Sequence, residues 1–398
     1  MRTSDFTPGL PVVPLALSAR DVPHVTIETN RTCNMRCRLC YNLDRESVKS
    51  VDDVKADLRT ALDRRRLAAV TLLGGEPTLH PGLPEIIGHI KSRGLFCAVL
   101  TNGLRFLDED GANLVGRIKR AGADRVYIHV DSGQAHVHAD IEADREKMSR
   151  LLEAACLPFA LSVTLYGGPE DDLTGVVRRY SRFRYFEGVL TTLPHDPSGR
   201  TAPPSDLRAV YEGLRAGLGL EPISFIPADT DDADVRWLIY FYLVNARTGG
   251  AFPVSPRVQR LAQKIFRWAP GRQFFAQTLG PAYVRTSLAP IVLAELFFSP
   301  RRAAGLLGLV RGNGSRPRSE ASGAGPARRL FSSLADLRAQ FITIQAPPRI
   351  DRASGRASIC RHCPDATVRN GRLVPVCIAD LVSPLDPRIR PQLACPEM

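Results

Sequence analysis

The sequence has little that would anchor the chain in a membrane or export it. Among its 398 residues, no uncharged stretch reaches the ~18–20 apolar residues that a membrane-spanning helix needs. Its first twenty residues contain three prolines and no small-residue cleavage site of the kind that ends a secretory signal. We therefore expect a cytoplasmic protein.

Aromatic residues and blocks of like charge are also scarce. Aromatic residues make up 7% of the chain, with only two tryptophans, Trp237 and Trp268. The formal net charge is +12, which would suit a nucleic-acid or anionic-membrane partner, but no run of five like charges occurs. Scattered charge of this kind favours a bias in composition, and we do not expect nucleic acid as a partner.

Cysteine, in contrast, is concentrated. Seven of the nine cysteines fall into two groups, whereas Cys97 and Cys156 stand alone in apolar runs and are expected to be core residues. In a reducing cytoplasm, grouped cysteines bind metal or perform redox chemistry more often than they form disulfides.

The first half of the chain alternates between two patterns. Short β-like runs are predicted at residues 24–29, 68–74, 96–102, 125–131, 159–166 and 186–194. Helical runs lie between them at 51–66, 82–93, 108–121 and 142–155. The alternation predicts an α/β fold, a partial (βα)6 barrel of the TIM type, with functional residues at the carboxyl ends of the strands.

Polar and glycine-rich motifs follow those predicted strands. The first strand is followed by "TCNMRCRLCYN", with Cys33, Cys37 and Cys40, and the second ends in "GGEP", Gly74–Pro77. The third ends in Thr101-Asn102-Gly103, and the fourth in "HVDSG", which contains Asp131. The C-x3-C-x2-C spacing and the GGEP motif, in this strand context, resemble the radical S-adenosylmethionine (SAM) superfamily over about the first 200 residues.

The resemblance implies a cofactor set and explains the count of three cysteines. Cys33, Cys37 and Cys40 would bind three irons of a [4Fe-4S] cluster, and the fourth iron would chelate SAM. Electron transfer from the cluster would then cleave SAM to a 5′-deoxyadenosyl radical, and a small ferredoxin- or flavodoxin-like protein would supply the electron. The residues expected to contact SAM are Leu39, Gly74, Gly75, Glu76, Pro77, Thr101, Asn102, Asp131 and Ser162, with Thr164 a weaker candidate. A zinc knuckle would leave GGEP unexplained.

A second cysteine group lies near the end of the sequence, where Cys360, Cys363, Cys377 and Cys395 follow a C-x2-C-x13-C-x17-C pattern. Between them, "ATVRNGRLVPV" predicts a hairpin with an Asn370-Gly371 turn, which would bring Cys377 back beside Cys360 and Cys363. Four thiolates suit zinc, mononuclear iron or an iron–sulfur cluster. The resemblance favours an auxiliary [4Fe-4S] cluster of the SPASM or twitch type, so two clusters are expected.

The intervening region predicts a helical, apolar insert. Its apolar stretches are 235–246, 258–280 and 287–310, and a Gly/Ser/Pro/Arg-rich loop follows at 311–329. This insert could form a lid over the barrel, or, with Arg301 and Arg302, contact the inner face of an anionic membrane. The predicted organisation is a lead-in at 1–23, the barrel at 24–200, the insert at 201–335 and a small C-terminal iron–sulfur module at 336–398.

The substrate stays open at this stage. One hypothesis is hydrogen abstraction from an unactivated carbon of a lipid or other apolar molecule, with C–C or C–S bond formation or oxidation assisted by the auxiliary cluster. The layout loosely resembles archaeal tetraether synthases. Other hypotheses are a small molecule, a peptide matured as by SPASM-type enzymes, and a non-enzymatic basic iron–sulfur protein that binds nucleic acid. No catalytic acid, base or radical-quenching residue can be named, although His129, His136 and His138 are candidates for substrate contact, against a reading as solvated loop residues.

Overall fold

The computed structural model describes most of the chain outside the predicted insert. The described residues are 1–8, 12–15, 18–167, 171–194, 206–245, 251–253, 255, 294 and 337–395. The predictions for Trp268, Arg301, Arg302 and the Gly/Ser/Pro/Arg-rich loop lie outside them, as do those for the stretches 258–280 and 287–310 apart from residue 294. Within the described part, no helix is both long and apolar enough to cross a membrane.

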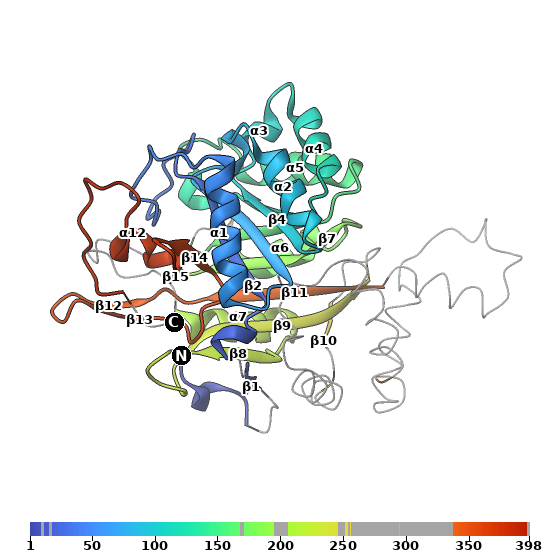
Figure 1. Ribbon diagram of the computed structural model, residues 1–398. Coiled ribbons are helices and arrows are strands. Elements are labelled where there is room, and N and C mark those ends of the chain that lie inside the picture. Colours follow the sequence, from blue (N-terminus) through green and yellow to red (C-terminus); the bar gives the residue numbers. More distant parts are fainter. Residues whose placement is uncertain are drawn as a thin grey trace, which may run out of the picture.

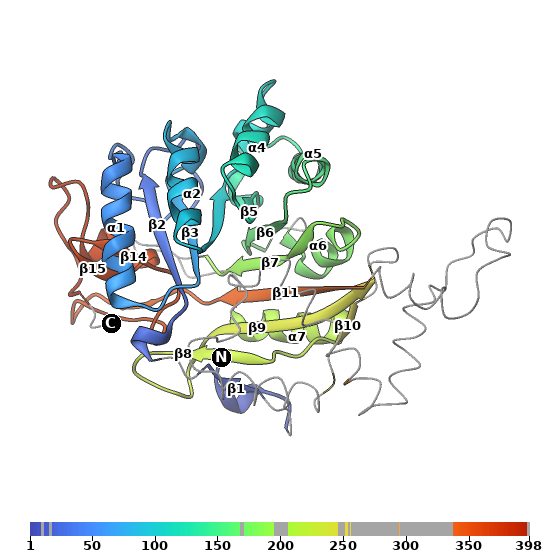
Figure 2. The same cartoon turned by 45° about the vertical axis from the view of Figure 1, so that its right-hand side comes forward.

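The centre of the molecule is the predicted parallel barrel sheet. Six strands, each parallel to the next, follow one another in chain order: β2 (His24–Asn30), β3 (Ala69–Gly74), β4 (Phe96–Thr101), β5 (Arg125–His129), β6 (Phe159–Thr164) and β7 (Phe186–Thr192). The connecting helices are α1 (Val51–Arg64), α2 (Leu83–Ser92), α3 (Leu104–Leu107), α4 (Gly111–Arg120), α5 (Ile141–Ala154) and α6 (Leu173–Tyr180). Figure 2 shows the longer helices on the outer side of the curved sheet. The α/β fold and partial barrel are confirmed.

Local sequence explains why these elements form. Helix α1 begins after Ser50, whose hydroxyl accepts from the amide of Asp53 while the Asp53 carboxylate accepts from the amide of Ser50. This capping box satisfies two of the first-turn N–H groups. The helix then buries Val54, Leu58 and Ala61, which recur at helical spacing.

The prediction of a helix at 235–246 is wrong. Residues Val235–Asn245 form strand β9, which pairs antiparallel with β8 (Ser224–Pro227), β10 (Ala251–Pro253) and β11 (Leu337–Gln345). Residues 235–244 are buried without interruption. An unbroken apolar run of this kind fits a strand covered on both faces as well as a buried helix, and its valine, isoleucine and aromatic content should have favoured the strand.

The predicted domain boundaries at 200 and 336 do not coincide with boundaries of the sheet. Strand β11 pairs parallel with β7 on one side and antiparallel with β9 on the other, so the sheet continues across both limits. Helix α7 (Leu207–Leu218) also belongs to this region. The eleven-stranded sheet of the described residues has the order β1-β8-β9-β11-β7-β6-β5-β4-β3-β2, with β10 beside β9.

The lead-in is part of the same sheet. Strand β1 (Val13–Pro14) pairs parallel with β8, and the amide of Val235 donates to the carbonyl of Met1 at 3.0 Å. Two short 3₁₀ turns, η1 (Thr3–Asp5) and η2 (Ala19–Asp21), flank this strand.

The predicted C-terminal hairpin is confirmed and packs against the barrel. Strands β14 (Ala366–Arg369) and β15 (Arg372–Pro375) are joined by Asn370 and Gly371, with φ of 48° and 71°, as a type I′ turn requires. Around it lie β12 (Arg349–Asp351), β13 (Arg356–Ser358), η7 (Val376–Ile378) and α12 (Ala379–Val382). Figure 1 shows β14, β15 and α12 beside α1 and β2. The Thr26 hydroxyl on β2 donates to the Ala366 carbonyl at 2.9 Å.

Candidate functional site

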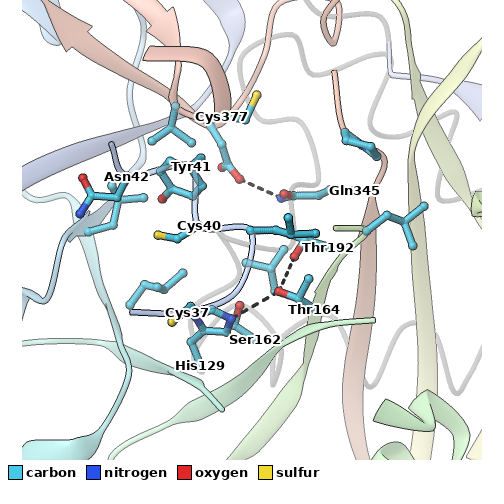
Figure 3. Close-up of a pocket in the computed structure, with 18 of the residues that line it drawn as sticks. Cys37, Cys40, Tyr41, Asn42, His129, Ser162, Thr164, Thr192, Gln345 and Cys377 are labelled. Atoms are coloured by element: carbon cyan, nitrogen blue, oxygen red, sulfur yellow. Dashed lines mark hydrogen bonds between the residues drawn. The ribbon is translucent and has the colours of Figure 1, made fainter. Parts of the chain in front are cut away.

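Both cysteine groups face a single cavity at the carboxyl ends of the barrel strands. The cavity has a volume of about 220 Å³. Its wall includes Cys33, Cys37 and Cys40 from the loop after β2, and Cys360, Cys363 and Cys377 from the C-terminal module. Figure 3 shows Cys377 at one end of this space and Cys37 at the other. Cys395 is not part of the wall; it packs with Cys377 against the small core of the C-terminal module.

The GGEP motif holds the loop that carries Cys33, Cys37 and Cys40, here called the cysteine loop (residues 32–42). The amide of Gly75 donates to the Asn30 carbonyl at 2.7 Å, and the amide of Glu76 donates to the Thr32 carbonyl at 2.8 Å. A Cβ atom at Gly74 would lie 2.0 Å from the Asn30 oxygen, and one at Gly75 would lie 2.1 Å from the Thr32 oxygen. The two glycines are therefore required by the close approach of the cysteine loop itself.

Glu76 joins the ends of β3 and β4. One of its carboxylate oxygens accepts from the hydroxyl of Thr101 at 2.6 Å, and from the amide and hydroxyl of Thr78 at 2.9 and 2.6 Å. The other accepts from the amide of Asn102 at 2.7 Å. Burial raises the pKa of Glu76, and these hydrogen bonds oppose that rise. Glu76 thus lines the cavity and also holds the ends of β3 and β4 together.

The cysteine loop also contacts the ends of β5 and β6. The amide of Arg38 donates to the Gly133 carbonyl at 3.2 Å, and the Tyr166 hydroxyl donates to the Arg38 carbonyl. Leu39 follows with a φ of 55°, in the left-handed region that costs a leucine energy. The loop is held in this conformation by contacts from the surrounding strand ends.

Two side-chain amides reach the cysteine sulfurs. The Nδ2 of Asn102 lies 3.8 Å from the Sγ of Cys33, and the Nε2 of Gln134 lies 3.4 Å from the Sγ of Cys37. Asn102 was expected near SAM, whereas Gln134 was not anticipated, because nothing marks a glutamine in the turn η4 (Ser132–Gln134) as functional. When a cluster is bound, N–H groups that donate to its cysteine sulfurs help to set its reduction potential.

Burial of the cysteine side chains around the cavity affects whether they are protonated. Burial raises the pKa of Cys37 to about 12 and also raises that of Cys33. At the other end, a hydrogen bond with Cys360 and burial raise the pKa of Cys363, and burial raises that of Cys377. These four groups are therefore thiols at neutral pH in the metal-free protein, and metal binding would release their protons.

The two cysteine groups supply thiolate donors of the kind that iron–sulfur clusters, zinc and mononuclear iron all take. In the described part of the chain, no three His, Cys, Asp or Glu side chains converge on a point that could hold one ion. Two buried acceptor atoms on the cavity wall, Gln134 Oε1 and Asn42 Oδ1, have no partner and would accept from a bound group.

The residues predicted to contact SAM divide into two sets. Those on the cavity wall are Leu39, Gly74, Gly75, Glu76, Asn102 and Ser162, together with the weaker candidate Thr164. Pro77, Thr101 and Asp131 lie behind it and are buried. Asp131 accepts from His129 Nε2 at 2.8 Å and from the Thr164 amide at 2.9 Å, so it orients two wall residues.

Of the three histidines singled out, one reaches the cavity. His129 lines the wall, and its pairing with Asp131 opposes the effect of burial and raises its pKa. His136 is exposed, and His138 is paired with Asp144 at 2.8 Å.

The far side of the cavity comes from the ends of β6 and β7, which were predicted, and from β9 and β11, which were not. The Thr164 and Thr192 hydroxyls lie 3.0 Å apart at the ends of β6 and β7, and Gln345, at the end of β11, donates to Asp365 at 2.8 Å. These pairs are drawn in Figure 3. Trp237 of β9 also lines the cavity and is 2% exposed. Strand β11 is parallel to β7, so its carboxyl end lies at the cavity. Had this strand been predicted, Gln345 at its end would have been a candidate site residue.

Comparison with known proteins supports an assignment for this site. The family model of the radical SAM superfamily matches residues 27–186. A PqqA peptide cyclase from Streptomyces rochei is 26% identical over 153 residues, which cover 36% of this chain and 41% of that protein. A probable GTP 3',8-cyclase from Sulfolobus acidocaldarius is 33% identical over 116 residues, 28% of this chain and 36% of that protein. The matches thus span less than half of either relative.

Solved structures of low similarity also match. Streptococcus suis SuiB bound to S-adenosylmethionine aligns with a TM-score of 0.40 and 13% identity, over 49% of this chain and 46% of SuiB. The assignment instead rests on the family match, which covers β2 to the start of β7 and includes both the cysteine loop and the GGEP turn that holds it. Residues 27–186 of this chain, which carry the cysteine loop and the GGEP turn, are therefore similar to the radical SAM superfamily.

Proposed function

We propose that the protein is an enzyme that abstracts a hydrogen atom from an unactivated carbon of a substrate held between its two cysteine groups. The observation that carries this proposal is the single cavity, whose wall contains cysteines from both groups. A substrate in that space would lie within reach of chemistry at either end.

The cysteine loop would hold a [4Fe-4S] cluster through Cys33, Cys37 and Cys40. When bound, the cluster and SAM supply the one-electron cleavage that generates a 5′-deoxyadenosyl radical. The chain's part is to bind and orient them: Leu39, Gly75 and Ser162 form wall surface beside the cluster ligands. The electron would come from a small ferredoxin- or flavodoxin-like donor.

The C-terminal module would hold a second [4Fe-4S] cluster through Cys360, Cys363, Cys377 and Cys395. The first three line the cavity wall on either side of the hairpin in the sequence, and Cys395 packs on the same small core as Cys377. Zinc or mononuclear iron is the alternative for this site. Its position beside the substrate space suits a role in oxidising or anchoring the substrate.

We favour a substrate with an apolar reacting part, such as a lipid. Much of the wall between the cysteine groups is apolar, with Leu190, Leu193, Trp237, Pro347 and Val376. Thr192 and Gln345 add polar groups that could fix one orientation. Contact with the inner face of a membrane would bring such a substrate to the cavity.

A peptide is the second candidate, because the relative from Streptomyces rochei is named as a peptide cyclase. An apolar side chain of a peptide would meet the same wall as a lipid chain. The reacting carbon would then belong to an amino-acid residue, and the C–C or C–S bond formed would link parts of one chain.

Isotope transfer distinguishes these candidates. Reconstituted protein, dithionite and SAM are incubated with lipid extract or with protein digest from cells grown in deuterated medium, and 5′-deoxyadenosine is analysed by mass spectrometry. We expect deuterium in 5′-deoxyadenosine with the lipid extract; deuterium with the digest alone would select the peptide. The triple variant C33A/C37A/C40A should form no 5′-deoxyadenosine. Iron should fall from about eight to about four atoms per chain, because one cluster remains.

A further inference from the structure

A buried ion network joins the C-terminal module to the barrel, outside the cavity described above. It consists of Glu28 and Arg31 at the end of β2, and Arg369 and Asp380 from β14 and α12; we call these four residues the clamp. None is more than 2% exposed. Arg369 donates to both carboxylate oxygens of Glu28 at 2.7 and 2.8 Å and to Asp380 at 3.0 Å. Arg31 pairs with Glu28 and Asp380.

The clamp balances its own charge, with two acids and two arginines. Burial alone would raise the pKa of Glu28, but Arg31 and Arg369 outweigh it and hold this pKa at about 2. Buried ion pairs of this kind are weak contributors to net stability, because desolvation of the charges offsets their attraction. Their geometric demands are strict, however, which makes them suited to fixing one arrangement of the parts they join.

The clamp contacts both ends of the cysteine loop. Arg31 comes two residues before Cys33, and its carbonyl accepts from the side chain of Asn42 at 2.9 Å. On the other side, Asp380 Oδ2 accepts from the amide of Leu43 at 2.8 Å and from that of Asp44 at 3.4 Å, a few residues after Cys40. One carboxylate from the C-terminal module thus binds the chain where it enters and where it leaves this loop.

The same residues belong to the segment that carries the second cysteine group. Arg369 ends the first strand of the hairpin that begins just after Cys363, and Asp380 follows Cys377 by three residues. We propose that Asp380 and Arg369 are positioning residues for the cysteine loop, so that the C-terminal module shapes the N-terminal metal site even when neither site holds metal. This inference goes beyond the proposed function and does not depend on any substrate.

The test uses the metal-free, full-length protein. Arg36 and Arg38 are exposed within the cysteine loop, so trypsin cleavage there reports loop opening, as does hydrogen exchange of residues 31–45. The variant Asp380→Asn removes one clamp charge. A matched control is Glu187→Gln, which also removes the acidic partner of a buried arginine, Arg125, but lies away from the loop.

For Asp380→Asn we expect cleavage at Arg36 and Arg38, and exchange of residues 31–45, to be at least tenfold faster than in the parent protein. Exchange in α4 and α5 should change less than twofold. Glu187→Gln should leave the loop within twofold of the parent. Two results would overturn the proposal. In one, Asp380→Asn shows the same rates of cleavage and hydrogen exchange in the loop as the parent protein. In the other, exchange becomes faster by the same factor in the loop and throughout the barrel.

A charge-balanced variant guards against simple misfolding. R31M/D380N removes one arginine and one acid together and leaves the Glu28–Arg369 pair in place. After anaerobic reconstitution, we expect this variant to lose iron from the cysteine-loop cluster to a chelator at least tenfold faster than Glu187→Gln does, measured by the electron paramagnetic resonance (EPR) signal that responds to SAM. Equal rates of loss in the two would show that the clamp does not position the loop.

Discussion

The two cysteine groups differ in how the protein supports them. The C-terminal group sits on a hairpin with a small core of its own, built from residues such as Ile359, Val374, Ile378 and Leu381. The cysteine loop is held by contacts from the strand ends and from Asp380. The cysteine loop therefore depends on distant parts of the chain, whereas the C-terminal group combines a local core with contacts to the barrel, such as the hydrogen bond from Arg65 to the Cys363 carbonyl at 2.9 Å.

Removal of a clamp residue should have the largest effect on stability. Arg369→Met leaves Glu28 and Asp380 short of a buried cation, and we expect a loss of ~3–5 kcal/mol in the free energy of unfolding. Chemical denaturation measures it. The exposed arginine Arg388, which pairs with Glu46 at the surface, provides the control, and Arg388→Met should give no measurable change. If Arg369→Met lowered the free energy of unfolding by less than about 1 kcal/mol, the clamp would tolerate a buried carboxylate without its arginine partner.

The pH dependence of stability should report the same network. Folding lowers the pKa of Glu28 from its ordinary value of 4.5 to about 2. The unfolded chain therefore binds more protons in this range, and stability should fall by roughly 3 kcal/mol as the pH falls from about 4.5 to about 2. Denaturant titrations at several pH values measure this slope. The variant Glu28→Gln should lack this component, and an identical slope in parent and variant would remove Glu28 as its source.

Glu76 offers a smaller effect at the other side of the cysteine loop. Glu76→Gln places an amide where the carboxylate accepts from Thr78, Thr101 and the Asn102 amide. We expect a cost on the order of 1.5–3 kcal/mol in stability, because hydrogen bonds to a charged group are lost. SAM should also bind more weakly, which equilibrium dialysis of the reconstituted protein would show. Unchanged SAM binding would confine Glu76 to a structural role.

The smallest predicted effect concerns the cluster potential. Gln134→Leu removes the N–H donor near Cys37 Sγ without changing a ligand. Because a donor to sulfur stabilises the more negative, reduced state, the midpoint potential should fall by roughly 20–40 mV, the equivalent of one weak hydrogen bond. EPR-monitored redox titration measures this shift. A rise in potential would mean that Gln134 points its oxygen toward the sulfur.

The sequence predicted the fold correctly where a short apolar strand is followed by a glycine- or cysteine-rich motif. The runs at 24–29 and 68–74 are short strands bounded by glycine or polar motifs, so both the barrel and the position of the cysteine loop could be predicted. It failed for β9, because an apolar run buried on both faces has no periodicity to distinguish strand from helix. Gln345 and Asp365 were missed for a related reason. Gln345 ends β11, which joins β7 although residues 193–336 separate the two strands, and Asp365 lies just before β14. No local pattern reveals either pairing.

We propose that both cysteine groups face one substrate space. The most direct test is EPR of the fully reduced, reconstituted protein, compared with C33A/C37A/C40A and with the variant C360S/C363S/C377S. Two clusters at opposite ends of one cavity should show spin–spin splitting or broadening in the parent that is absent from both variants. A parent spectrum equal to the sum of the two variant spectra, with two clusters present by iron analysis, would contradict the claim.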